Sequence, residues 1–128
     1  MDNFDFSFSG IKTAVINLNH KNPNLNKANL CASFEKAATQ MLISNVEKVL
    51  KDNTLRKKKI VLAGGVSANS YIRKAFDELS KKEKIKVLYP DLKLCTDNAA
   101  MIACAGYYNF LDGKRGDLNL NAIPNLKL

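Results

Sequence analysis

The chain has 128 residues, of which 46% are hydrophobic and 25% are charged. This composition predicts one folded domain with its own core and argues against an intrinsically disordered chain. The longest apolar run, residues 99–108, is too short to span a bilayer, and the start MDNFDFSF lacks a basic signal region. Three cysteines at irregular spacing indicate reduced thiols. We therefore expect a cytoplasmic protein with no membrane partner.

The net charge of +8 is concentrated in the middle of the chain. Residues 51–86 carry 11 Lys and Arg against 4 Asp and Glu, whereas residues 1–50 have a net charge of +1 and residues 87–128 a net charge of 0. Two interpretations stay open, a solvated rim of helix ends and loops or an edge that faces a polyanion such as tRNA. The second interpretation rests on six lysines: Lys57, Lys58, Lys59, Lys81, Lys82 and Lys84.

The N-terminal half predicts one strand and two helices. Phenylalanines alternate with polar residues over positions 4–8, which is typical of a half-buried strand, and a helix is expected after Gly10. Residues 19–29 are rich in Asn and predict a surface loop. Apolar residues then recur at helical spacing, which predicts a long helix over about 30–51 with Asn29 as its N-cap.

The C-terminal half predicts alternating strands and helices. Residues 59–65 and 85–90 are short apolar segments typical of strands, and the unbroken apolar run in the first indicates a strand covered on both faces. Helices are expected over about 68–80 and 97–111, with an irregular tail over 110–128. This order indicates an α/β fold, with a short, mostly parallel sheet flanked by helices, in a single domain.

The junction AGGVSAN links the first of these strands to its helix. Gly64 and Gly65 permit positive φ angles and lack the Cβ atoms that would hold a ligand away, and Asn69 offers an amide that both donates and accepts. A nucleotide fits this pattern, because helix N-termini favour anions. A tight turn with Ser67 or Asn69 as N-cap explains the same residues. The residues alone leave both interpretations open.

The junction CTDNAA opens the last helix. The pattern favours Asp97 as an N-cap, and the alternative is a metal ligand or a carboxylate that faces phosphates. A single carboxylate cannot hold a metal, so the alternative requires ligands from outside this chain. His20 is the only histidine and lies in the predicted loop. The sequence therefore predicts no self-contained hydrolytic site of the Ser-His or Cys-His kind.

Four segments, in this order, resemble the C-terminal portion of the TsaD/Gcp family of tRNA N6-adenosine threonylcarbamoyltransferases, formerly called glycoproteases: DFSFSGIKTAV, CASFEKAATQMLISNVEKVL, VLAGGVSANSYIRKAF and LCTDNAAMIACAG. The resemblance implies the two-lobed ATPase fold shared with actin, sugar kinases and heat-shock chaperones, of which this chain would be part of one lobe. It implies that Gly64, Gly65 and Asn69 line a pocket for ATP or threonylcarbamoyl-adenylate. It also implies that Asp97 binds a divalent iron or zinc ion, with one carboxylate oxygen still able to cap the helix.

The same resemblance implies a reaction and a set of partners. The family transfers a threonylcarbamoyl group from its adenylate to the N6 amine of adenosine 37 in tRNA. The chain lacks the family's N-terminal lobe and its HxxxH metal ligands, so we expect it to be inactive alone. Its implied partners are tRNA, that N-terminal lobe and other proteins of the threonylcarbamoyladenosine pathway, including an inactive paralogue; a homodimer is a further expectation. Two alternatives stay open, a non-catalytic module that pairs with an active family member and a basic tRNA-binding domain.

Overall fold

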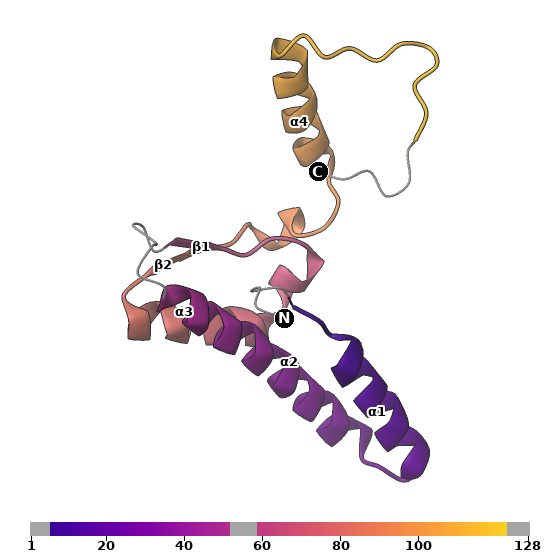
Figure 1. The fold of residues 1–128 in the computed structure, drawn as a ribbon, viewed down its shortest axis with the longest axis vertical. Helices are drawn as coiled ribbons and strands as arrows, with labels where there is room; N and C mark the ends of the chain where they lie inside the picture. The colour runs from indigo at the N-terminus through magenta and orange to yellow at the C-terminus, as the bar shows by residue number, and fades with distance from the viewer. Residues whose placement is uncertain (1–5, 52–58, 123–128) are drawn as a thin grey trace. The chain divides into compact units, whose positions relative to one another are not determined.

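The computed structural model describes residues 6–51 and 59–122 (Figure 1). The chain divides into two compact units, Met1–Cys95 and Thr96–Leu128. The single domain expected from the sequence stays a prediction. In the part of the chain that the structure describes, no helix combines the length and the apolar character that a membrane crossing requires.

Among the described residues, the first unit contains three α-helices, two strands and two short 3-10 helices, and the second unit contains one α-helix. In chain order these are α1 (Ser9–Lys21), α2 (Lys27–Leu50), β1 (Lys59–Val61), η1 (Gly65–Ala68), α3 (Ser70–Glu83), β2 (Lys86–Leu88), η2 (Leu92–Leu94) and α4 (Ala99–Leu111). After α4, residues 112–122 form neither helix nor strand.

The two strands pair in parallel, as the sequence predicts. Their register places Lys59 opposite Lys86 and Ile60 opposite Val87. Parallel neighbours need a crossover connection, and α3 provides it. The predicted α/β class with a short parallel sheet is therefore confirmed.

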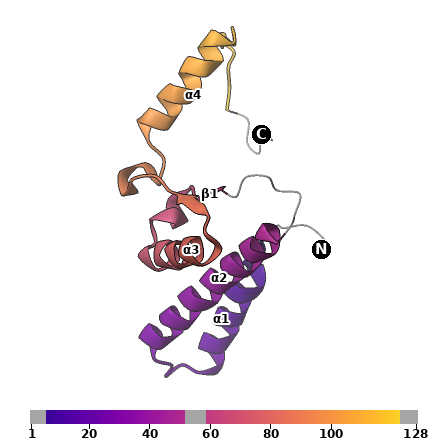
Figure 2. The ribbon, with the colours of Figure 1, turned by 90° about the vertical axis from the view of Figure 1, so that its left-hand side faces the viewer.

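The core of the first unit lies between the sheet and the helices α2 and α3. Both helices lie on the same side of the strands (Figures 1 and 2). The apolar spacing of α3 predicts four inward positions, Ile72, Ala75, Phe76 and Leu79. Ala75 is half-buried, and the other three side chains are buried. Each such side chain contributes about 2 kcal/mol of stabilisation when it leaves water. Leu50 and Ile85 complete the buried cluster.

The opposite face of the sheet is open within this unit. Val61 and Leu88 are register partners, and their side chains are 69% and 40% exposed. The prediction that the first strand is covered on both faces is therefore wrong for the unit as described. Its strands carry a single helical layer, whereas a fully parallel sheet usually carries two.

The predicted N-terminal strand is absent from the described residues. Residues 6–8 have no regular structure, α1 already begins at Ser9, and Gly10 lies inside its first turn. The rings of Phe6 and Phe8 stack on each other, with their centroids 6.5 Å apart. A strand requires a hydrogen-bonded neighbour, and β1 and β2 pair only with each other among the described residues. Residues 4 and 5 of the predicted strand lie outside the described part.

The loop between α1 and α2 is shorter than the sequence predicts. Asn26, and not Asn29, is the N-cap of α2, because its Oδ1 accepts a hydrogen bond of 3.1 Å from the Asn29 N–H. Either asparagine could accept a hydrogen bond from the backbone N–H three residues after it, so the chemistry of the side chains alone does not distinguish them.

Candidate functional site

The junction after β1 begins with a backbone conformation that requires glycine. Gly64 has φ 83° and ψ 170°, a region that residues with a Cβ atom essentially never occupy. A Cβ atom at Gly64 would have no atom of the described residues within 4 Å, so the requirement comes from the backbone and not from close packing. Gly65 begins η1, and its φ angle is not positive. The expected use of positive φ therefore holds for Gly64 alone.

Asn69 joins this junction to both neighbouring helices. Its Oδ1 accepts a hydrogen bond of 3.0 Å from the Ile72 N–H, which makes Asn69 the N-cap of α3. Its Nδ2 donates a hydrogen bond of 2.8 Å to Glu35 Oε1 on α2. The capping interpretation is thus confirmed for Asn69 and is wrong for Ser67, which is buried inside η1. One N–H and one lone pair of the amide remain available for a ligand.

Arg73 connects the junction after β1 to the segment after β2, and the sequence reasoning missed it. Its Nε donates to Ser67 O at 2.6 Å, and its Nη2 donates to Pro90 O at 2.8 Å and to Cys95 Sγ at 3.2 Å. The guanidinium also lies 4.4 Å from the centre of the Tyr89 ring. The sequence did contain a signal for this role. A positive charge in the first turn of a helix is unfavourable toward the helix dipole, so an arginine there is expected to have a partner outside the helix.

Tyr89 extends this set of contacts to the exposed side of α3. Its hydroxyl donates a hydrogen bond of 2.8 Å to Asp77 Oδ1. This bond, with a smaller contribution from desolvation, raises the pKa of Tyr89 above its usual value of 10.0.

The second unit begins with Asp97 next to the N-cap of α4. The cap is Asn98, whose Oδ1 accepts a hydrogen bond of 3.0 Å from the Met101 N–H. The interpretation of Asp97 as the cap is therefore wrong, and so is the expectation that its carboxylate combines capping with metal binding. The helix begins one residue later than that interpretation requires. Asp97 is exposed, and no hydrogen bond or ion pair to another described residue involves its carboxylate.

The carboxylate of Asp97 fits one position of a metal site and no more. Among residues 6–51 and 59–122, no group of three or more His, Cys, Asp or Glu side chains could hold a metal ion. Asp97 has no competing partner in the part of the chain that the structure describes, so its oxygens are available as hard ligands. A complete site would need further ligands from elsewhere.

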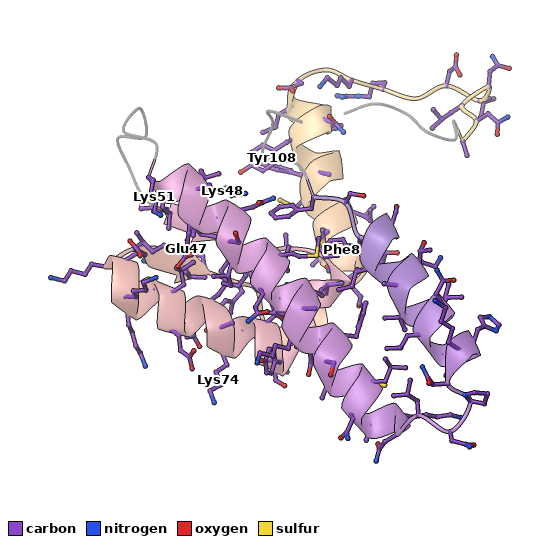
Figure 3. All side chains as sticks on the ribbon, turned by 60° about the horizontal axis from the view of Figure 1, so that its bottom comes forward. Phe8, Glu47, Lys48, Lys51, Lys74 and Tyr108 are labelled. Carbon is purple, nitrogen blue, oxygen red and sulfur yellow. The ribbon has the colours of Figure 1, made fainter. Side chains whose placement is uncertain are left out.

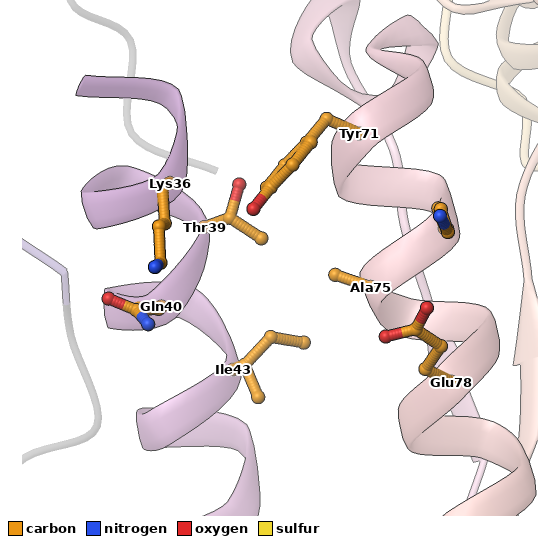
Figure 4. Close-up of a pocket in the computed structure, with 8 residues that line it drawn as sticks. Lys36, Thr39, Gln40, Ile43, Tyr71, Ala75 and Glu78 are labelled. Carbon is orange, nitrogen blue, oxygen red and sulfur yellow. The ribbon is translucent and has the colours of Figure 1, made fainter. Parts of the chain in front are cut away.

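A pocket of about 220 Å³ lies between α2 and α3 (Figure 4). Lys36, Thr39 and Tyr71 are among its lining residues. Thr39 is only 3% exposed, and its Oγ1 has no hydrogen-bond partner among the described residues. The apolar stripe predicted along α2 does not include these lining residues, so its spacing contains no signal for the pocket.

The basic residues that flank the glycine junction in the sequence lie at the other end of the strands. Lys59 and Lys86 begin β1 and β2, whereas Gly64 follows the end of β1. Lys84, with φ 52°, ends α3 just before β2. Lys57 and Lys58 lie outside the described residues.

One lysine of this basic end is paired with an acid. Lys82 Nζ lies 2.7 Å from Glu47 Oε1, and this hydrogen bond raises the pKa of Lys82 and lowers that of Glu47. Glu47 is close to Lys48 in the last turn of α2 and to Lys51, the C-cap that follows it (Figure 3).

Comparison with known proteins identifies the family. The family model described as "TsaD: tRNA N6-adenosine threonylcarbamoyltransferase" matches residues 1–104. The proteins of that name from Clostridium novyi and Clostridioides difficile are each 49% identical over 131 residues, which cover 99% of this chain and 38% of the relative. The relative from Thermosipho africanus is 50% identical over 127 residues, which cover 98% of this chain and 38% of the relative.

The chain thus spans about 38% of the length of the curated relatives that it matches. The family model covers well over half of the chain, and the identity extends along nearly all of it. The predicted class, an α/β part of an actin-like ATPase-type fold, agrees with this match. The chain belongs to the TsaD family of tRNA N6-adenosine threonylcarbamoyltransferases.

Proposed function

We propose that this chain is the C-terminal part of a tRNA N6-adenosine threonylcarbamoyltransferase, located in the cytoplasm. The observation that carries the proposal is the 49% identity over 99% of the chain to relatives of that name. The reaction transfers a threonylcarbamoyl group from its adenylate to the N6 amine of an adenosine in tRNA. The chain alone is inactive under this proposal, because it corresponds to only 38% of such a relative.

The junction after β1 contacts the nucleotide, either ATP or threonylcarbamoyl-adenylate. Support comes from the open space in front of Gly64 and from the conformation that only glycine adopts there. Gly65 starts the following turn and also lacks a Cβ atom that would limit approach. Asn69 binds and orients the nucleotide with the N–H and the lone pair that its two internal hydrogen bonds leave over.

Asp97 supplies one carboxylate ligand to a divalent iron or zinc ion, and the other ligands come from outside this chain. The exposed carboxylate, which has no partner among the described residues, supports this role. When bound, such an ion polarises a carbonyl and stabilises negative charge that develops on its oxygen. Asn98 keeps α4 capped independently, so metal binding at Asp97 costs the helix no hydrogen bond.

Calorimetric titration of ATP tests this proposal. The chain is measured alone and with the unmatched N-terminal part of the Clostridium novyi relative supplied as a second polypeptide. We expect weak or no binding alone and restored binding in the mixture. Asn69→Ala should weaken the restored binding, and Asp97→Ala should abolish metal uptake by the mixture. Asn22→Ala, at the exposed end of α1, is the matched control.

Two results would contradict the proposal. One is nucleotide binding by the mixture that Asn69→Ala leaves unchanged. The other is efficient tRNA modification by the chain alone.

The basic end of the first unit supports a second candidate function, binding of the tRNA backbone. Five lysines gather at the starts of the strands and the end of α3: Lys59, Lys81, Lys82, Lys84 and Lys86. For this function, tRNA affinity should fall steeply with salt concentration, and each lysine-to-alanine change should reduce the slope by about 1. Lys82 should contribute least, because Glu47 already pairs with it. A slope that these changes leave unaltered would eliminate the candidate.

A further inference from the structure

The amide of Asn69 is held in one of its two orientations by partners of opposite character. The Ile72 N–H can only donate, so it requires the oxygen of the amide. An ionised Glu35 carboxylate can only accept, so it requires the nitrogen. An amide rotated by half a turn would place two donors together at one end and two acceptors together at the other.

The two bonds differ in strength and in origin. The cap is a neutral bond within the start of α3, over three residues. The bond to Glu35 spans 34 residues and comes from the middle of α2. A bond to an ionised carboxylate is roughly twice as strong as a neutral one. Glu35 is therefore the stronger constraint on the amide, and it anchors the junction to a second helix.

We propose that Glu35 is a positioning residue for nucleotide binding, acting through Asn69. It holds the amide so that the same N–H and the same lone pair are presented to the nucleotide in every molecule. This inference rests on the proposed nucleotide contact of Asn69. Pre-organisation of this kind increases affinity, because the bound orientation is already populated in the free protein.

A double-mutant cycle tests the inference, using ATP affinity of the chain with the N-terminal part of the Clostridium novyi relative. Glu35→Ala should weaken ATP binding by about twofold or more, because the apparent affinity falls with the fraction of molecules whose amide has the binding orientation. In the Asn69→Ala background, the same change should weaken it no further. Glu35→Gln should fall between Glu35→Ala and the unchanged chain, because its oxygen still accepts the bond but its amide can rotate.

Glu47→Ala is the matched control for this cycle. Glu47 also lies on α2 and also bonds across to α3, through Lys82 at 2.7 Å, but far along the helix from the junction. We expect it to leave ATP affinity unchanged. An unchanged affinity in Glu35→Ala, or an equal loss with and without Asn69, would overturn the inference.

A measurement without ligand separates this inference from the proposed function. The side-chain amide of Asn69 gives its own signals in an NMR spectrum of the chain. These signals should shift in Glu35→Ala and stay in place in Glu47→Ala. If Asn69→Ala leaves ATP affinity unchanged, the nucleotide proposal fails, and the spectrum still shows whether Glu35 holds the amide. Signals that Glu35→Ala does not move would refute the positioning role directly.

Discussion

Replacement of Arg73 by alanine should destabilise the first unit more than any other single surface change there. The guanidinium donates to two backbone carbonyls, those of Ser67 and Pro90, which follow different strands. It also contacts Cys95 Sγ and the ring of Tyr89. Without it, two loops that are far apart in sequence lose their common partner.

The size of the effect follows from these contacts. A hydrogen bond to a charged group contributes about 1.5–3 kcal/mol, and a cation–π contact adds about 0.5–1 kcal/mol. After a reduction for partial exposure of Arg73, we expect a loss of about 4 kcal/mol for Arg73→Ala. Arg73→Lys should lose about half of that, because a single ammonium group cannot donate to both carbonyls along the directions of the guanidinium fork.

Urea unfolding followed by circular dichroism measures these losses, and Arg115→Ala is the control. Arg115 also donates to a backbone carbonyl, that of Phe110 at 2.8 Å, and its guanidinium lies 3.8 Å from the centre of the Phe110 ring. Its contacts are local and exposed, so we expect a loss below about 1 kcal/mol. If Arg73→Ala costs no more than Arg115→Ala, the connecting role of Arg73 is refuted.

Three further predictions concern the junctions and pH. Gly64→Ala should lower the free energy of unfolding by about 1–3 kcal/mol and Gly65→Ala by clearly less, because only Gly64 has a conformation restricted to glycine; equal losses would contradict this. Asn98→Ala should speed amide hydrogen exchange in α4, at a cost of about 1 kcal/mol, whereas Asp97→Ala should leave exchange unchanged. The raised pKa of Tyr89 stabilises the fold below about pH 10, and this contribution is lost as the pH rises through the folded-state value. Alkaline unfolding of Tyr89→Phe should lack that step, and an unchanged profile would show that the hydrogen bond has no effect on stability.

The sequence predicted the elements that depend on contacts between residues close together in the chain. The helix α3 was expected over about 68–80 and spans Ser70–Glu83, because its apolar spacing reports directly which face is buried. The capping residues were harder to place. The N-cap of α2 is Asn26 where Asn29 was expected, and the N-cap of α4 is Asn98 where Asp97 was expected. Neighbouring Asn and Asp side chains have almost the same capping chemistry, so the sequence does not distinguish them.

Contacts between distant residues could not be predicted in this way. The bond from Asn69 to Glu35 and the bonds of Arg73 to Pro90 and Cys95 depend on how helices and strands pack. The exposure of Val61 could not be predicted either. The apolar run around it predicted a strand covered on both faces, but the first unit covers only one face. The roles of Gly64, Gly65, Asn69 and Asp97 toward a nucleotide and a metal remain predictions from resemblance.

The sheet face that is open within the first unit has a practical consequence for anyone who prepares this chain. Val61 and Leu88 form a wet apolar strip, and both strands have a free hydrogen-bonding edge among the described residues. Such strips promote precipitation and edge-to-edge aggregation. The net charge of +8 opposes this by mutual repulsion, so added salt should reduce solubility. Dilute, low-salt buffers are therefore the conditions in which the isolated polypeptide should stay in solution.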